Sequence, residues 1–167
     1  NGEISVGDAD RLKSIIKSAN DGGHLVSSIR LDSPGGIIGE GVKLASIVRY
    51  GKIASVVPNG AKCASACFIV FAAGDPKYVS YGASVGVHGA SDEAGRETVE
   101  AGAATVSMAR IVKDLGVPAP IIGKLVVTPP DQIVGLTQED LRSMGTTMTG
   151  RPAQTPPVEL ASAQTTP

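Results

Sequence analysis

Hydrophobic and polar positions alternate between helical and strand-like patterns along most of this chain. Apolar residues recur at helical spacing over residues 8–21, where we expect Asp8 to be the N-cap and the glycines after Asn20 to end the helix. Further helices are expected over residues 37–50, 97–115 and 118–126. Short apolar or β-branched runs predict strands, which cover residues 25–31, 53–57, 78–80 and 84–88.

Two segments need separate interpretation. Residues 63–73 form a continuous small and apolar run that fits a buried strand or a buried helix, and its alanines and the stop at Gly74 favour a helix. Thr137 followed by Asp140 predicts a capping box at the start of another helix. Strands that alternate with helices in this way predict an α/β fold.

Length and composition indicate one folded domain with a tail. Residues 1–149 are the expected domain, and residues 150–167, dominated by Pro, Ala, Thr and Gln, are expected to be disordered. The chain begins at Asn1 without a Met, so we expect a fragment or a processed product. Aromatic residues make up 3% and Trp is absent, so the core must be built from Ala, Val, Ile and Leu.

The charge balance excludes some function classes. The net charge of −1 argues against a nucleic-acid binder, which would carry a basic excess. The 42% of apolar residues is too high for a disordered chain, and no run of 18 apolar residues is present.

Three segments could carry chemistry. The segment Ser33-Pro34-Gly35-Gly36 joins a predicted strand to a helix, Ser65 lies between two alanines, and His88 ends an apolar strand. Taken singly, these are a strand-to-helix turn, an N-cap serine and a structural histidine. The other histidine, His24, lies beside two glycines and is expected to face solvent.

Taken together, the three segments supply the parts of a serine hydrolase. A serine hydroxyl needs a base such as histidine to become a nucleophile. The oxyanion that forms next needs backbone N–H donors, and Gly36 and Ala66 can provide them. Gly35 and Gly36 also leave room for a substrate backbone beside the strand edge.

The chain resembles the Clp-protease proteolytic subunits and the wider crotonase superfold. The matching residues are Leu31 to Gly36, Ala64-Ser65-Ala66 and Val87-His88, and both their order and the interval from Gly36 to Ser65 fit. The segment from Cys63 to Phe68, with Gly86-Val87-His88 and Thr128-Pro129-Pro130-Asp131, is similar to a bacterial branch thought to be exported. The resemblance covers residues 2–145 and implies a single-domain spiral of ββα units.

The resemblance implies a serine peptidase with Ser65, His88 and Asp131 as the triad. Asp131 takes the third place because it precedes a short Thr-capped helix; Asp140 competes, but its capping box explains it, and Asp114 is expected to be solvated. Some relatives use a lysine base, for which Lys62 and Lys124 are the candidates, but His88 in its motif weakens that alternative.

We expect a peptide or unfolded protein substrate, no nucleic acid, no cofactor and no metal. The superfold commonly forms rings or trimer-based assemblies, so a homo-oligomer is allowed. Docking elements for an unfoldase are not visible, so ATP-driven degradation is not implied. Two alternatives stay open: an interaction module without catalysis, and a crotonase-type enzyme that handles acyl-CoA.

The two cysteines flank the candidate nucleophile. On neighbouring turns of a helix, Cys63 and Cys67 would have Cα atoms about 6 Å apart, which allows a disulfide. They are either two small buried residues that pack around Ser65 or a disulfide that braces its turn in an oxidising compartment.

Overall fold

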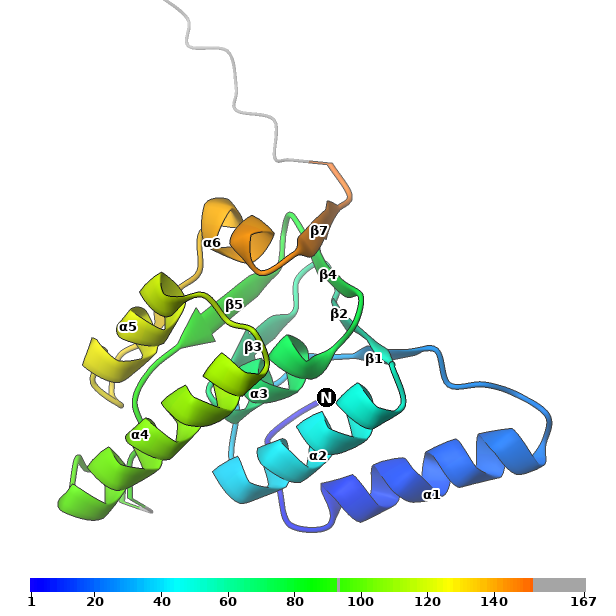
Figure 1. Cartoon of the computed structure of the whole chain (residues 1–167), viewed down its shortest axis with the longest axis horizontal. Helices are drawn as coiled ribbons and strands as arrows, with labels where there is room; N and C mark the ends of the chain where they lie inside the picture. The colour runs from blue at the N-terminus through cyan, green and yellow to red at the C-terminus, as the bar shows by residue number, and fades with distance from the viewer. Residues whose placement is uncertain (93, 152–167) are drawn as a thin grey trace, which may run out of the picture.

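The computed structural model describes residues 1–92 and 94–151, and they form an α/β fold (Figure 1). The helices are α1 (Asp8–Asp21), α2 (Ile38–Tyr50), α3 (Ala66–Ala73), α4 (Val99–Asp114), α5 (Ala119–Val127) and α6 (Gln138–Ser143). The strands are β1 (Ser28–Arg30), β2 (Ala54–Val57), β3 (Lys62–Ala64), β4 (Lys77–Ser80), β5 (Ser84–Val87), β6 (Val134–Gly135) and β7 (Thr146–Thr149).

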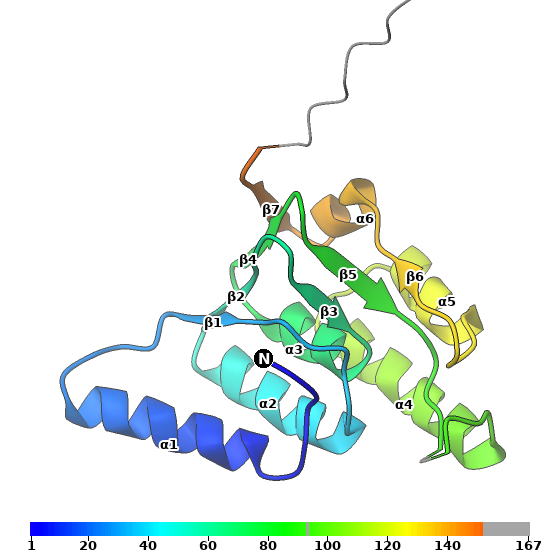
Figure 2. The same cartoon turned by 180° about the vertical axis from the view of Figure 1, so that it is seen from behind.

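The strands form two sheets. The first has the order β1-β2-β4-β7 and is parallel throughout. The second has the order β3-β5-β6, with β3 and β5 parallel and β6 antiparallel to β5 (Figure 2). A bridge between Ser33 and Cys63 adds the segment after β1 to this second sheet. A bridge between Ile4 and Gly36 pairs the N-terminal segment with the segment after β1.

These pairings build three successive ββα units, as the resemblance predicts. In each unit the chain passes through the first sheet, then through the second sheet, and then into a helix. The units are β1 with residues 33–36 and α2, then β2, β3 and α3, then β4, β5 and α4. The junction between the second strand and the helix therefore recurs three times, and each recurrence carries one of the predicted motifs.

Helix α3 lies at the centre of the molecule. All eight of its residues are buried, and it contacts both α2 and α4. Helix α1 packs on the outside of α2, and α5 packs beside α4 (Figure 1). From Ala66 on, the small and apolar run that periodicity could not assign is thus a buried helix, whereas its first residues, 63 and 64, belong to β3.

The sequence prediction was right for the helices and for three strands, and it missed three others. Expected and observed bounds of the helices agree within three residues, and the capping box of Thr137 and Asp140 is present. Strand β1 begins at Ser28, later than the predicted residue 25. The side chain of Leu25 is 88% exposed, so the apolar residue that suggested an earlier start does not pack in the core. The missed strands lack an apolar strand pattern of their own: β6 has two residues, β7 is mostly threonine, and β3 overlaps the start of the small and apolar run that was assigned to a helix.

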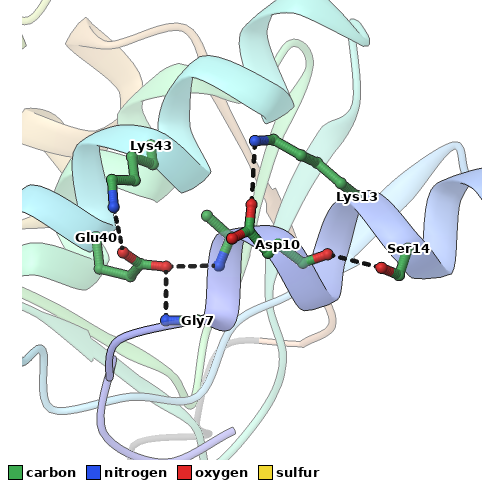
Figure 3. Close-up of polar contacts among 7 residues, drawn as sticks. Gly7, Asp10, Lys13, Ser14, Glu40 and Lys43 are labelled. Carbon is green, nitrogen blue, oxygen red and sulfur yellow. Dashed lines mark hydrogen bonds and ion pairs between the residues drawn. The ribbon is translucent and has the colours of Figure 1, made fainter.

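The predicted N-cap of α1 was wrong. The N-cap is Gly7, and Asp8 instead accepts a hydrogen bond from the Ser5 N–H. The free N–H groups of Gly7 and Ala9 donate to Glu40, a buried carboxylate of α2, over 3.1 and 2.8 Å (Figure 3). Lys43 completes this cluster at 3.1 Å from Glu40. A helix start can thus be capped by a residue distant in sequence, which local patterns do not reveal.

The pKa of Glu40 is held below its ordinary value. The Ala9 N–H is the largest cause, and Lys43 and the Gly7 N–H act in the same direction against the effect of burial. Glu40 lies in the first turn of α2, four residues after Gly36. The contact therefore ties the start of α1 to the start of the helix that follows the glycine pair.

Within the described ranges, no helix is long and apolar enough to cross a membrane. Strand β7 ends at Thr149, and the domain boundaries expected from the sequence stay a prediction. The predicted disordered tail lies almost wholly outside the described residues.

Candidate active site

The candidate site lies where parallel strands of the second sheet end. Cys63 of β3 pairs with Ser33 on one side and with Val85 of β5 on the other. Because these strands are parallel, their carboxyl ends meet at one edge of the sheet. The segments that leave this edge contain Gly36, Ser65 and His88, the residues that the sequence singled out.

Ser65 occupies a sharp turn between β3 and α3. Its backbone has φ 56° and ψ −126°, a conformation that costs a non-glycine residue about 1–3 kcal/mol. Ser65 stands at the N-cap position of α3, but its side chain makes no capping hydrogen bond, so the N-cap interpretation is wrong. A strained turn from strand to helix is the device by which nucleophile elbows present a serine hydroxyl.

Gly35 packs directly against this turn. A Cβ atom on Gly35 would lie 2.5 Å from the Ser65 Cβ and 2.9 Å from the Ala64 carbonyl oxygen, and the φ of Gly35 is +114°. Both the space and the backbone conformation therefore require glycine. The sequence indicated a role in substrate binding for this residue, but its contact with Ser65 could be seen only in the folded chain.

The backbone beside Gly36 leaves a donor free. Ile4 donates to the Gly35 carbonyl over 2.7 Å, and Ile37 donates to the Ile4 carbonyl over 2.9 Å. Successive backbone groups of an extended segment point to opposite sides, so the Gly36 N–H faces away from Ile4. Ala66 is the first residue of α3, and a helix leaves its first N–H groups without an internal partner.

His88 follows β5 and is half-buried. Its Nδ1 lies 2.7 Å from the backbone oxygen of Gly89. A carbonyl oxygen only accepts hydrogen bonds, so Nδ1 carries the proton in the neutral ring and Nε2 carries the free lone pair. A neutral imidazole in this tautomer can accept a proton at Nε2.

Asp131 approaches this edge from the other side. Strand β6 runs antiparallel to β5, with Val134 opposite Val87, so the residues before Val134 lie toward the His88 end of β5. Asp131 is exposed. Within the described residues, no hydrogen bond links Ser65, His88 and Asp131 to one another. The assignment of this triad stays a prediction.

The competing acid, Asp140, is engaged elsewhere. It accepts from Thr137 as part of the capping box, and from the Lys124 ammonium at 2.5 Å. Burial opposes its ionisation, but Lys124 and the Thr137 groups hold its pKa below the ordinary value. Lys124 is thereby paired with a carboxylate. Asp114 and His24 are exposed, as expected.

A disulfide joins Cys63 and Cys67 across the Ser65 turn, with Cα atoms 5.2 Å apart. Both residues are fully buried. Of the two interpretations of this pair, the bracing disulfide is therefore the one found here. In the part of the chain described, no three metal-ligating side chains gather in one place.

Comparisons with known proteins give structural neighbours only. No family model matches the chain, and no curated protein matches it. The ClpP protease catalytic domain from Plasmodium falciparum is similar, with a TM-score of 0.67 and 19% identity over 93% of this chain and 86% of that one. ClpP1 from Listeria monocytogenes has a TM-score of 0.65 and 15% identity over 89% of each chain.

A third neighbour is the 1510-N membrane protease specific for a stomatin homolog from Pyrococcus horikoshii. Its TM-score is 0.59 and its identity 18%, over 90% of this chain and 70% of that one. The TM-scores of 0.59–0.67 show a shared fold, although the sequence identities are low, and the three ββα units with their recurring strand-to-helix junctions agree with it. The chain therefore has the fold of the ClpP-type proteases.

Proposed function

We propose that this chain is a serine peptidase with Ser65 as its nucleophile. The observation that carries the proposal is the strained Ser65 turn, packed against Gly35 and followed directly by the first residue of α3. Strain that the surrounding structure maintains is typical of functional sites. The fold shared with proteases supports the same reaction class.

In the proposed reaction, the Ser65 hydroxyl attacks the carbonyl carbon of a peptide bond. His88 takes the hydroxyl proton at Nε2 and then gives it to the leaving amine. The N–H groups of Gly36 and Ala66 donate to the oxyanion of the tetrahedral intermediate. Water then hydrolyses the acyl-enzyme, with His88 again as the base. In the free enzyme the Gly89 carbonyl accepts the hydrogen bond from His88 Nδ1. Asp131 would orient the imidazole by replacing this carbonyl as the acceptor.

The substrate would be an extended peptide. The side of Gly36 that faces away from Ile4 offers backbone groups to which an added strand can bind. One neighbouring structure, a lysine-substituted variant of the 1510-N protease, is a complex with a substrate peptide. A cavity of about 190 Å³ lies between the segments that contain His88 and Asp131 and is lined by Ala90, Val106 and Val126, among others. It would suit a small apolar side chain.

We also propose an oxidising, exported location, because disulfides persist in such compartments and are rare in the cytosol. The disulfide between Cys63 and Cys67 supports this. A homo-oligomer stays a prediction from the fold.

A fluorophosphonate probe tests the proposed function. It should label Ser65 covalently, as read by mass spectrometry of the digested protein, and the Ser65→Ala variant should take up no label. Neither a non-catalytic interaction module nor a crotonase-type enzyme would react in this way, because neither has an activated serine. Wild-type protein that takes up no more label than Ser65→Ala would refute the peptidase.

A further inference from the structure

The disulfide between Cys63 and Cys67 encloses only three residues, and the middle one is Ser65. In the chain-entropy model, cross-linking stabilises a protein by restricting its unfolded state, and the shortest loops gain the least. A ring this small therefore contributes less to global stability than a long-range cross-link would. Its effect is concentrated on the few residues that it encloses.

The positions of the two cysteines show which parts of the candidate site the cross-link restrains. Cys63 pairs with Ser33, which begins the segment that carries the glycine pair, and with Val85 of β5, the strand that leads to His88. Cys67 lies in the first turn of α3, next to Ala66. The cross-link thus joins two elements of the candidate site. One is β3, which pairs with the segment of the glycine pair and with the strand that leads to His88. The other is α3, whose first residue is Ala66.

The enclosed turn requires such support. Ser65 has a left-handed φ of 56°, and relaxation of the turn would move its Cβ away from Gly35. Neither sulfur is exposed, so the disulfide has no evident role at the surface. Movements of about 1 Å at a reacting group can cost about a hundredfold in rate.

We infer that the disulfide between Cys63 and Cys67 is a positioning element of the active site, which holds the strained Ser65 turn in its reactive geometry. This inference rests on the proposed peptidase function. It states that breaking the cross-link slows the attack by Ser65 while substrate binding and the fold persist. The two cysteines act through Ser65 and do not themselves touch the substrate.

The first test replaces both cysteines. The Cys63→Ala/Cys67→Ala variant removes the cross-link and keeps small apolar side chains in the core. We expect its rate of labelling by a fluorophosphonate, and its kcat on a peptide substrate, to fall by about ten- to a hundredfold, with KM within about twofold of the wild type. Val57→Ala is the matched control, because it trims a fully buried residue of β2 in the other sheet. It should lower Tm and leave kcat nearly unchanged.

The second test uses the wild-type chain, in case the double variant fails to fold. Dithiothreitol breaks the S–S bond by thiol–disulfide exchange: two electrons and two protons pass to the two cysteine sulfurs, and the reagent closes to its cyclic disulfide. Because the sulfurs are buried, the reduction is carried out in mild urea, which is then removed. Alkylation and mass spectrometry count the thiols, and circular dichroism checks the fold. Reoxidation should restore the lost rate.

The possible outcomes separate the two proposals. Equal labelling rates in oxidised and fully reduced folded protein would overturn the positioning role and leave the peptidase standing. A rise in KM with unchanged kcat would overturn it as well, since that pattern reports substrate binding. If oxidised wild type takes up no more label than Ser65→Ala, the peptidase fails and the positioning role falls with it.

Discussion

The two ends of the candidate site are built differently. At the nucleophile end, Ser65 is flanked by buried residues on both sides, bracketed by a disulfide and packed against Gly35. At the acid end, Asp131 is exposed and follows two prolines in a loop between α5 and β6. The backbone around Ser65 is therefore set by the core of the fold. The His88 ring is bonded to the Gly89 carbonyl, and a contribution of the exposed Asp131 to its orientation stays a prediction.

The largest expected effect comes from the nucleophile itself. Ser65→Ala should lower kcat by about 10⁶-fold, the scale seen when the serine of a well-studied protease is removed. Steady-state hydrolysis of a peptide substrate measures it, and an unchanged Tm shows that the fold is intact. Turnover at the wild-type rate would mean that another residue carries the reaction.

The acid end should respond to Asp131→Asn. An amide cannot stabilise the imidazolium or maintain the tautomer as a carboxylate does, so kcat should fall by up to about 10⁴-fold if Asp131 completes the triad. Asp140→Asn is the matched control: it weakens a helix cap and should cost about 1 kcal/mol of stability with little change in kcat.

Other results for Asp131→Asn and Asp140→Asn would change the assignment of the third triad residue. A crippled Asp140→Asn beside a normal Asp131→Asn would reassign the third residue. If both retain activity, the site is a dyad of Ser65 and His88 in which the Gly89 carbonyl orients the ring.

The nucleophile end should be intolerant of added atoms. In Gly35→Ala, the new Cβ would meet the Ser65 Cβ at 2.5 Å, so the turn must shift and kcat should fall by about 10²-fold, with a loss of at least about 1 kcal/mol of stability. Gly39→Ala, in α2 with open space around it, should be neutral or stabilising. Normal kinetics in Gly35→Ala would show that this end is more plastic than its packing indicates.

The smallest expected effect on activity lies at Glu40, the carboxylate that caps α1. Its pKa is lowered in the folded chain from the ordinary 4.5, so its ionised form stabilises the fold above that pH. This contribution is lost as the pH falls through the folded-state value. Glu40→Gln should therefore lower Tm at neutral pH, and the difference from wild type should shrink as the pH falls below about 4.5.

Thermal melts from pH 3 to pH 8 measure that difference, with Glu139→Gln, an exposed residue of α6, as the control. A gap in Tm that stays constant over this range would assign the effect to packing rather than to the charge on Glu40. Near-normal kcat is expected at neutral pH, because Glu40 does not touch the site.

The sequence alone determined the alternation of elements, since the helices α1, α2, α4 and α5 leave a clear periodic pattern. It also determined which residues to compare: the glycine pair, Ser65 and His88 stand out by residue type and by their place at the ends of predicted elements. The helix expected in the ambiguous apolar run is found over Ala66–Ala73, where the alanines and the stop at Gly74 are local features, but residues 63 and 64 belong to β3.

Only the tertiary structure decided how these residues relate. Strands β3, β6 and β7 carry no apolar strand pattern of their own and form because neighbouring strands pair with them. The contact of Gly35 with Ser65, the capping of α1 by Glu40 and the disulfide around the nucleophile all depend on where the fold brings the groups together. Such contacts have no local signature, because their free energy comes from packing and pairing between segments distant in sequence or from the precise course of the backbone.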